Sequence, residues 1–155
     1  MSKVFVLEDD PQAMAIIDFL EHLGHEVVHA EELYSTIYFL ERKPGLATMG
    51  KLLFDLAVPR CDAQHKAGTP RSIVYAGQYA GLDYIANNYQ HWPNFRQAVE
   101  AGKVAIITAH DRGMQDDFQR KLEQFPGLCK LTIISKLADN MDEKLIDFLD
   151  DKQEG

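Results

Sequence analysis

Polar side chains stand directly after four of the short apolar runs in this sequence. They are Glu8, Asp9, Asp10, Asp55, Thr108 and Lys136. Carboxylates that meet at one place repel one another unless a cation lies among them, and a site with only oxygen ligands favours Mg²⁺. A lysine and a hydroxyl beside that cation add two donors for a tetrahedral anion, as phosphoryl transfer requires. Asp55 is then a candidate phosphoryl acceptor.

The elements that must position these side chains are predicted to alternate along the chain. Runs rich in branched apolar residues predict five buried strands, at residues 3–7, 25–30, 51–56, 103–108 and 130–135. Between them, apolar residues recur at helical spacing opposite charged faces. These stripes are Met14, Ile17, Leu20 and Leu23; Leu33, Ile37 and Leu40; Leu82, Ile85, Tyr89 and Trp92; Met114, Phe118, Leu122 and Phe125; and Met141, Leu145, Phe148 and Leu149. Such alternation predicts an α/β fold with a parallel sheet, whose strand ends meet at one edge.

Composition narrows the class of protein. With 155 residues, of which 46% are hydrophobic, the chain can bury one core of ordinary size, so a single domain over residues 1–155 is predicted. The formal charge of −8 argues against direct binding of nucleic acid through a basic surface. The two cysteines, Cys61 and Cys129, suggest neither a disulfide framework nor a zinc site. The apolar runs are too short for a membrane span or signal sequence, so a cytoplasmic protein with no membrane contact is predicted.

Four segments, KVFVLEDDP, LLFDLAVP, IITAH and IISK, resemble in order the signature segments of bacterial response-regulator receiver domains. The resemblance covers essentially the whole chain. It implies a flavodoxin-like, doubly wound (βα)5 fold with strand order 2-1-3-4-5. It also implies a Mg²⁺-dependent signalling domain that accepts a phosphoryl group from a histidine kinase or phosphotransfer protein and acts on an unknown downstream protein. Such a domain is not an enzyme in the usual sense, because it catalyses only its own phosphorylation and dephosphorylation.

The resemblance assigns a metal shell to four positions. Asp9 would bind Mg²⁺ directly, and Glu8 largely through water. Asp55 would bind the metal as well as carry the phosphoryl group, and the backbone carbonyl of Ala57 would complete the shell.

The resemblance also assigns the groups that meet the phosphoryl oxygens. Thr108 would donate a hydrogen bond to one oxygen, and Lys136 would pair with another. Ala109 keeps the small residue that leaves room for the phosphoryl group. His110 lies where the family tunes the lifetime of that group, but a partly exposed structural histidine is an equal alternative.

Three departures from the family pattern mark this chain as atypical. Ile133 stands where the family has the aromatic residue of its switch, and Leu137 replaces a proline. A cis peptide before Leu137 is therefore disfavoured, since a non-proline cis bond costs about 3 kcal/mol. The third departure is an insertion at about residues 60–80, which carries more basic than acidic side chains. It is interpreted either as a lid or docking loop beside Asp55 or as an inert connector.

Other interpretations of the same residues stay open. Asp55, Glu8 and Asp9 are also residues that cap helices and turns, and Lys136 is also compatible with a solvated surface lysine. Ile133, Leu137 and the insertion favour an interaction module that keeps the receiver fold but works without phosphorylation. LLFDLAVP also resembles the nucleophile strand of haloacid-dehalogenase phosphatases. That family needs a second aspartate two residues after the nucleophile, where this chain has Ala57.

Overall fold

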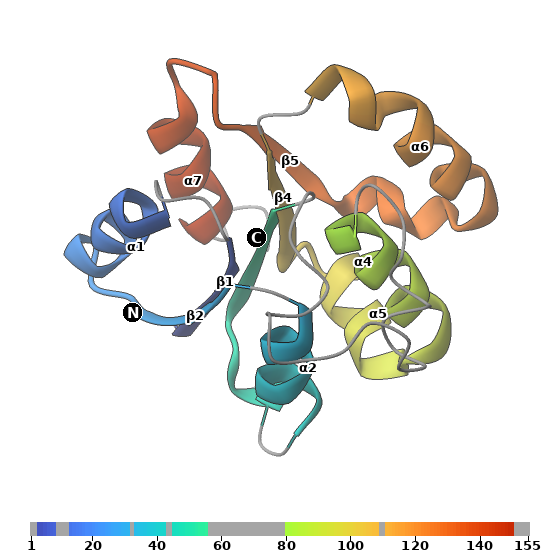
Figure 1. Cartoon of the computed structure of the whole chain (residues 1–155), viewed down its shortest axis with the longest axis horizontal. Helices are drawn as coiled ribbons and strands as arrows, with labels where there is room; N and C mark the ends of the chain where they lie inside the picture. The colour runs from blue at the N-terminus through green and yellow to red at the C-terminus, as the bar shows by residue number, and fades with distance from the viewer. Residues whose placement is uncertain are drawn as a thin grey trace.

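A five-stranded parallel sheet forms the middle of the molecule (Figure 1). The computed structural model describes residues 3–8, 13–31, 33–42, 45–55, 80–108 and 111–150. The strands are β1 (Lys3–Leu7), β2 (Glu26–Ala30), β3 (Lys51–Asp55), β4 (Val104–Thr108) and β5 (Thr132–Ser135). Their order is β2-β1-β3-β4-β5, and every neighbouring pair is parallel. The predicted fold class, a flavodoxin-like sheet of order 2-1-3-4-5, is thereby confirmed.

Helices cover both faces of this sheet (Figure 1). The α-helices are α1 (Ala13–His22), α2 (Leu33–Glu41), α4 (Ala80–His91), α5 (Pro93–Glu100), α6 (Asp111–Gln124) and α7 (Met141–Asp150), with two 3₁₀ turns, η1 (Gly45–Thr48) and η2 (Pro126–Lys130). Helices α1 and α7 pack on one face of the sheet. Helices α2, α4, α5 and α6 and both 3₁₀ turns pack on the other.

The interior positions of β1, β3 and β4 are apolar because both faces of the sheet are covered, and the polar residues of these strands stand at their ends. In β1, Val4 and Val6 face the layer of α1 and α7, whereas Phe5 and Leu7 face the opposite layer. Side chains of a strand alternate between the two faces, so each strand supplies residues to both cores. This is the pattern expected of a parallel sheet buried on both sides.

Helix α1 differs in one respect from the predicted apolar stripe. Met14 and Leu23 were assigned to that stripe, but their exposed fractions are 58% and 40%. The other two members of the predicted stripe, Ile17 and Leu20, are buried, and Ile16 is buried beside them. Leu23 lies beyond the last helical residue, in the turn that leads to β2, so helical spacing no longer determines which way it faces.

The apolar stripe that begins at Leu82 spans two helices instead of one. Helix α4 ends at His91, and α5 begins at Pro93 with Trp92 in an extended conformation (φ −126°, ψ 97°). A residue before proline is driven out of the helical region, and proline is favoured at the first helical position. The guanidinium of Arg96 on α5 donates hydrogen bonds of 2.8 Å to the carbonyls of Tyr89 and Gln90, which caps the end of α4.

Part of the predicted organisation falls outside the residues that the structure describes. The insertion at about 60–80 lies almost wholly there, so the single domain over 1–155 and the role of the insertion stay predictions. Within the described part of the chain, no helix has the length and apolar character that crossing a bilayer requires.

Candidate functional site

The carboxyl ends of β1, β3, β4 and β5 bring charged residues to one edge of the sheet. Leu7 of β1 pairs with Phe54 of β3, so the next residues in these strands, Glu8 and Asp55, are neighbours. Because parallel strands end at the same edge, the sheet places side chains from different segments of the chain side by side.

Strand β4 continues the same edge toward β5. Asp55 pairs with Ile107, and Thr108 pairs with Ser135, the residue before Lys136. The backbone N–H of Lys136 donates a hydrogen bond of 2.8 Å to the carbonyl of Thr108. This bond fixes the start of the Lys136 side chain beside the end of β4, where Thr108 is fully buried.

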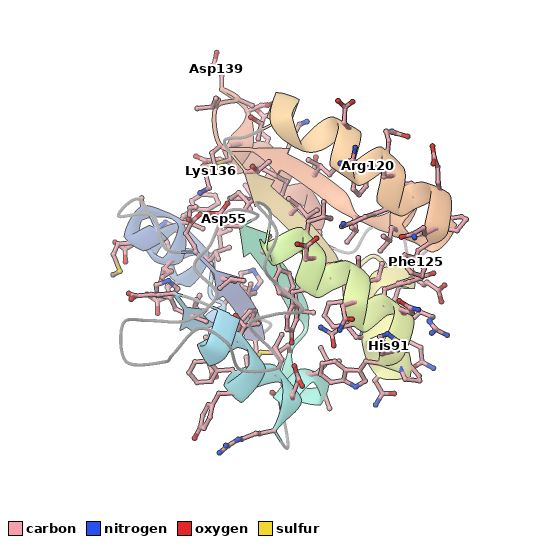
Figure 2. The ribbon with its side chains drawn as sticks, turned by 45° about the vertical axis from the view of Figure 1, so that its right-hand side comes forward. Asp55, His91, Arg120, Phe125, Lys136 and Asp139 are labelled. Carbon is pink, nitrogen blue, oxygen red and sulfur yellow. The ribbon has the colours of Figure 1, made fainter. Side chains whose placement is uncertain are left out.

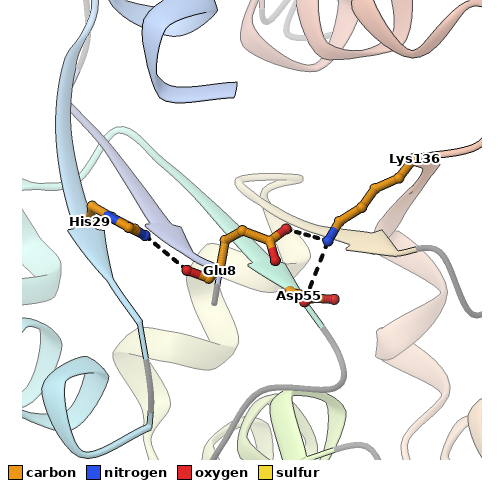
Figure 3. Close-up of polar contacts among 4 residues, drawn as sticks. All are labelled: Glu8, His29, Asp55 and Lys136. Carbon is orange, nitrogen blue, oxygen red and sulfur yellow. Dashed lines mark hydrogen bonds and ion pairs between the residues drawn. The ribbon is translucent and has the colours of Figure 1, made fainter. Parts of the chain in front are cut away.

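Lys136 lies between two carboxylates (Figure 3). Its ammonium Nζ forms an ion pair with Glu8 Oε2 and lies 3.4 Å from Asp55 Oδ2. All three side chains are buried, with exposed fractions of 8% for Lys136, 0% for Glu8 and 7% for Asp55. Figure 2 shows Lys136 and Asp55 close together, with His91 at the distant end of α4.

Among the described residues, the group of Glu8, Asp55 and Lys136 carries more negative than positive charge. Two buried carboxylates share one ammonium, and burying a charge is costly unless it is paired and hydrogen-bonded. Asp55 Oδ1 is also buried and has no hydrogen-bond partner among the described residues. An unpartnered, buried carboxylate oxygen is a suitable ligand for a hard cation such as Mg²⁺. The donor chemistry of Glu8 and Asp55 therefore fits the metal that the sequence predicts.

The backbone of Glu8 is held on the side of β2. Its N–H donates a hydrogen bond of 3.0 Å to the carbonyl of Ala30, and its carbonyl lies 2.8 Å from Nε2 of His29 (Figure 3). Since a carbonyl can only accept, the imidazole must donate from Nε2. His29 was not among the residues that the sequence patterns assigned to the site. Its contact with Glu8 depends on the pairing of β1 with β2, which spacing within β2 does not reveal.

Solved structures of receiver domains resemble this chain over nearly all of its length. Similarity to the receiver domain protein of Methanospirillum hungatei JF-1 covers 100% of this chain and 99% of that chain, with a TM-score of 0.60 and 17% identity. The Francisella response regulator receiver domain matches over 99% of this chain and 98% of its own, with a TM-score of 0.62 and 16% identity. The chain has the receiver-domain fold.

A third similar structure contains a metal. It is the receiver domain of a sensor histidine kinase from Pseudomonas aeruginosa PAO1, described with a magnesium ion coordinated in its active-site cleft. It has a TM-score of 0.56 and 17% identity, over 94% of this chain and 93% of that chain. No protein-family model matches the sequence, and no curated protein matches it.

Several residues that the sequence assigns to this receiver site are not among those described. Asp9, Ala57, Ala109 and His110 belong to that group, so their roles stay predictions. In the described ranges, which exclude Asp9, no group of three or more metal-ligating side chains is close enough together to hold an ion.

The two atypical positions near Lys136 have different environments. Ile133, at the position of the family's switch aromatic, is half-buried and packs against the core on the side of α4 and α6. Leu137 has an exposed fraction of 75%.

Proposed function

We propose that this chain is a phosphorylation-dependent signalling receiver that accepts a phosphoryl group on Asp55 from a histidine kinase or phosphotransfer protein. The observation that carries the proposal is the buried group of Asp55, Glu8 and Lys136 at the carboxyl edge of the sheet. Such an arrangement joins a nucleophilic carboxylate to a cation that can neutralise an incoming phosphoryl group.

The proposed reaction is an in-line transfer. A carboxylate oxygen of Asp55 attacks the phosphorus of a phosphohistidine, a new O–P bond forms, and the P–N bond breaks. The departing imidazole takes a proton from solvent. Lys136 lies 3.4 Å from Asp55 Oδ2, so its ammonium can pair with a phosphoryl oxygen attached there. Thr108, at the adjacent strand end, supplies a hydroxyl for a second phosphoryl oxygen.

Mg²⁺ is proposed as the cofactor. Glu8 and Asp55 would hold it together with Asp9 and the carbonyl of Ala57, and it would supply positive charge against the transferring group. The chain's own residues orient the acceptor and exclude water from it. The protein would catalyse its own phosphorylation and dephosphorylation and no other reaction.

Incubation with acetyl phosphate and Mg²⁺, followed by intact-mass measurement, tests the proposal. The wild-type chain should gain one phosphate, and Asp55→Asn should gain none. Asp142→Asn, an exposed aspartate on α7, is the matched control and should be phosphorylated like the wild type. An unmodified wild-type mass with several phosphoryl donors would favour the phosphorylation-independent interaction module, which Ile133 and Leu137 also suit.

Metal binding has a separate test. Mg²⁺ should bind weakly, because such a site keeps several waters and few protein ligands, and Asp9→Ala should abolish binding. Isothermal titration of both proteins measures this directly. Equal affinity in the variant would exclude Asp9 as a ligand.

A further inference from the structure

A cavity of about 760 Å³ opens at the amino-terminal edge of the sheet, at the opposite end of β3 from Asp55. Leu52, near the start of β3, lies at its base. Leu52 and Asp55 are three residues apart, which is about 10 Å along a strand. The cavity is therefore separate from the candidate phosphorylation site.

Residues of α2 and η1 and residues of α5 line this cavity. Helix α5 contributes Asn94, Gln97 and Ala98, and its C-cap residue Ala101 follows at the same helical spacing, so all four share one face. The two alanines leave open the space that larger side chains would fill. The other face of α5 buries Phe95 and Val99 in the core.

The base of the cavity is apolar and the rim is charged. Leu40, Leu46, Met49 and Leu52 line the base, and all are buried members of the same core cluster. Trp92, the only tryptophan in the sequence, forms part of the wall, with its ring stacked on Phe95 at 5.8 Å.

Positive charge predominates at the rim. Arg42 and Lys103 line the cavity, and neither forms an ion pair with a carboxylate in the described ranges of the chain. The guanidinium of Arg42 lies over the ring of Tyr38, 4.6 Å from its centroid. Among the lining residues that the structure describes, Glu41 is the one carboxylate, and it accepts a hydrogen bond of 3.1 Å from the hydroxyl of Tyr84.

We propose that this cavity binds an amphipathic organic anion, in which an aliphatic or aromatic body carries a carboxylate. Its volume lies within the range of small-molecule sites, which are mostly apolar with a few polar groups that orient the ligand. The apolar body would contact the buried base, and the carboxylate would pair with Lys103 and Arg42 at the rim. The formal charge of the chain is −8, yet two basic side chains stand at this rim. Their positive charge favours a negatively charged ligand.

Decanoate is a suitable probe, and 1-decanol is its uncharged counterpart. Because Trp92 is the sole tryptophan, its fluorescence reports on the cavity in the unmodified chain. We expect a saturable change in Trp92 emission with decanoate and about fivefold weaker binding of 1-decanol, as loss of partly exposed ion pairs predicts. The absence of a saturable change with decanoate would overturn the proposal.

Two substitutions locate the binding. Ala98→Phe should fill the cavity and abolish the saturable response. Ala101→Leu, at a more exposed position on the same face, should weaken decanoate binding. This variant replaces Ala98→Phe in the test if Ala98→Phe does not fold. Unchanged decanoate affinity in a folded variant of either kind would place the ligand elsewhere and contradict the proposal.

A third substitution tests the charge selection. Lys103→Gln should weaken decanoate about threefold and leave 1-decanol unchanged. Lys144→Gln, on α7 at the opposite face of the sheet, is the control and should change neither affinity. Equal binding of the two probes in the wild type would overturn the assignment of an anion.

The same variants distinguish a protein occupant. Sedimentation of the wild type should show a monomer whose state does not depend on Ala98. A dimer that Ala98→Phe dissociates would assign the cavity to a second copy of the chain, against a small-molecule ligand. None of these measurements involves phosphorylation, so the proposal stands or fails independently of Asp55.

Discussion

The two edges of the sheet stabilise their carboxylates in different ways. At the carboxyl edge, Glu8 and Asp55 are buried and share the ammonium of Lys136. At the amino-terminal edge, Glu41 at the end of α2 and Glu100 at the end of α5 accept hydrogen bonds from the hydroxyls of Tyr84 and Tyr89, at 3.1 Å and 2.8 Å.

Solvent explains this difference. Glu41 is half-buried and Glu100 is exposed, so water continues to solvate their charges and a neutral hydroxyl is a sufficient partner. Glu8 has no exposed surface, and a fully desolvated carboxylate requires a cation. The carboxylates at the carboxyl edge therefore depend on the ammonium of Lys136, whereas Glu41 and Glu100 need only water and a hydroxyl.

Removal of Lys136 should have the largest effect. Lys136→Met leaves two buried carboxylates without their cation, and we expect a loss of about 3–5 kcal/mol in the free energy of unfolding. Urea denaturation near neutral pH, without Mg²⁺, measures it. Adding Glu8→Gln to this variant should restore part of the loss, because it removes one of the two charges. A loss below about 1 kcal/mol would mean that the carboxylates are not desolvated in solution.

Substitution of two neighbouring leucines in β3 allows the packing on the two faces of the sheet to be compared. Leu53 packs in the core between the sheet and helices α1 and α7, whereas Leu52 lies at the base of the open cavity. We expect Leu53→Ala to cost about 3–4 kcal/mol, within the usual range for a buried leucine. Leu52→Ala should cost about 1 kcal/mol less, because fewer atoms surround the deleted group. Thermal or urea unfolding of both variants tests this, and equal losses would indicate that the cavity is closed in solution.

The hydroxyl of Tyr84 should contribute less to the free energy of unfolding than Lys136 or the two leucines. Tyr84→Phe removes its hydrogen bond to Glu41, and we expect a loss of about 1 kcal/mol because water can replace the donor. A double-mutant cycle with Glu41→Gln isolates this interaction from other effects of each substitution. A coupling free energy as large as that between Lys136 and Glu8 would mean that the two edges do not differ in how strongly they hold their carboxylates.

The smallest effect concerns the pH dependence of stability. Burial, followed by the hydrogen bond to Glu100 and its negative charge, raises the pKa of Tyr89 above its ordinary value of 10.0. The fold therefore favours the protonated phenol. This stabilisation is complete below the unfolded pKa and is lost as the pH rises through the higher folded pKa. Between neutral pH and about pH 11, the wild type should lose stability more steeply than Tyr89→Phe. If the free energy of unfolding fell equally with pH in the two proteins, the raised pKa of Tyr89 would be contradicted.

Local sequence patterns placed four residues of the candidate site at strand ends. Glu8, Asp55, Thr108 and Lys136 were each placed at a strand end because an apolar run stops immediately before them. A parallel sheet then requires these ends to share an edge, which is where the structure has them. The pattern did not predict that Lys136 would pair with Glu8 as well as approach Asp55, since that depends on how buried side chains pack.

The sequence by itself determined the strands and their polar ends, because the interior of a strand buried on both faces is apolar and the polar side chains then stand where the apolar run ends. The resemblance to receiver domains added their order. Only the tertiary structure decided the cavity beside α5. Its lining residues come from α2, η1, β3 and α5, and no local pattern records which distant segments will meet. The contact of His29 with Glu8 has the same origin, since strand pairing and not spacing along the chain brings the two together.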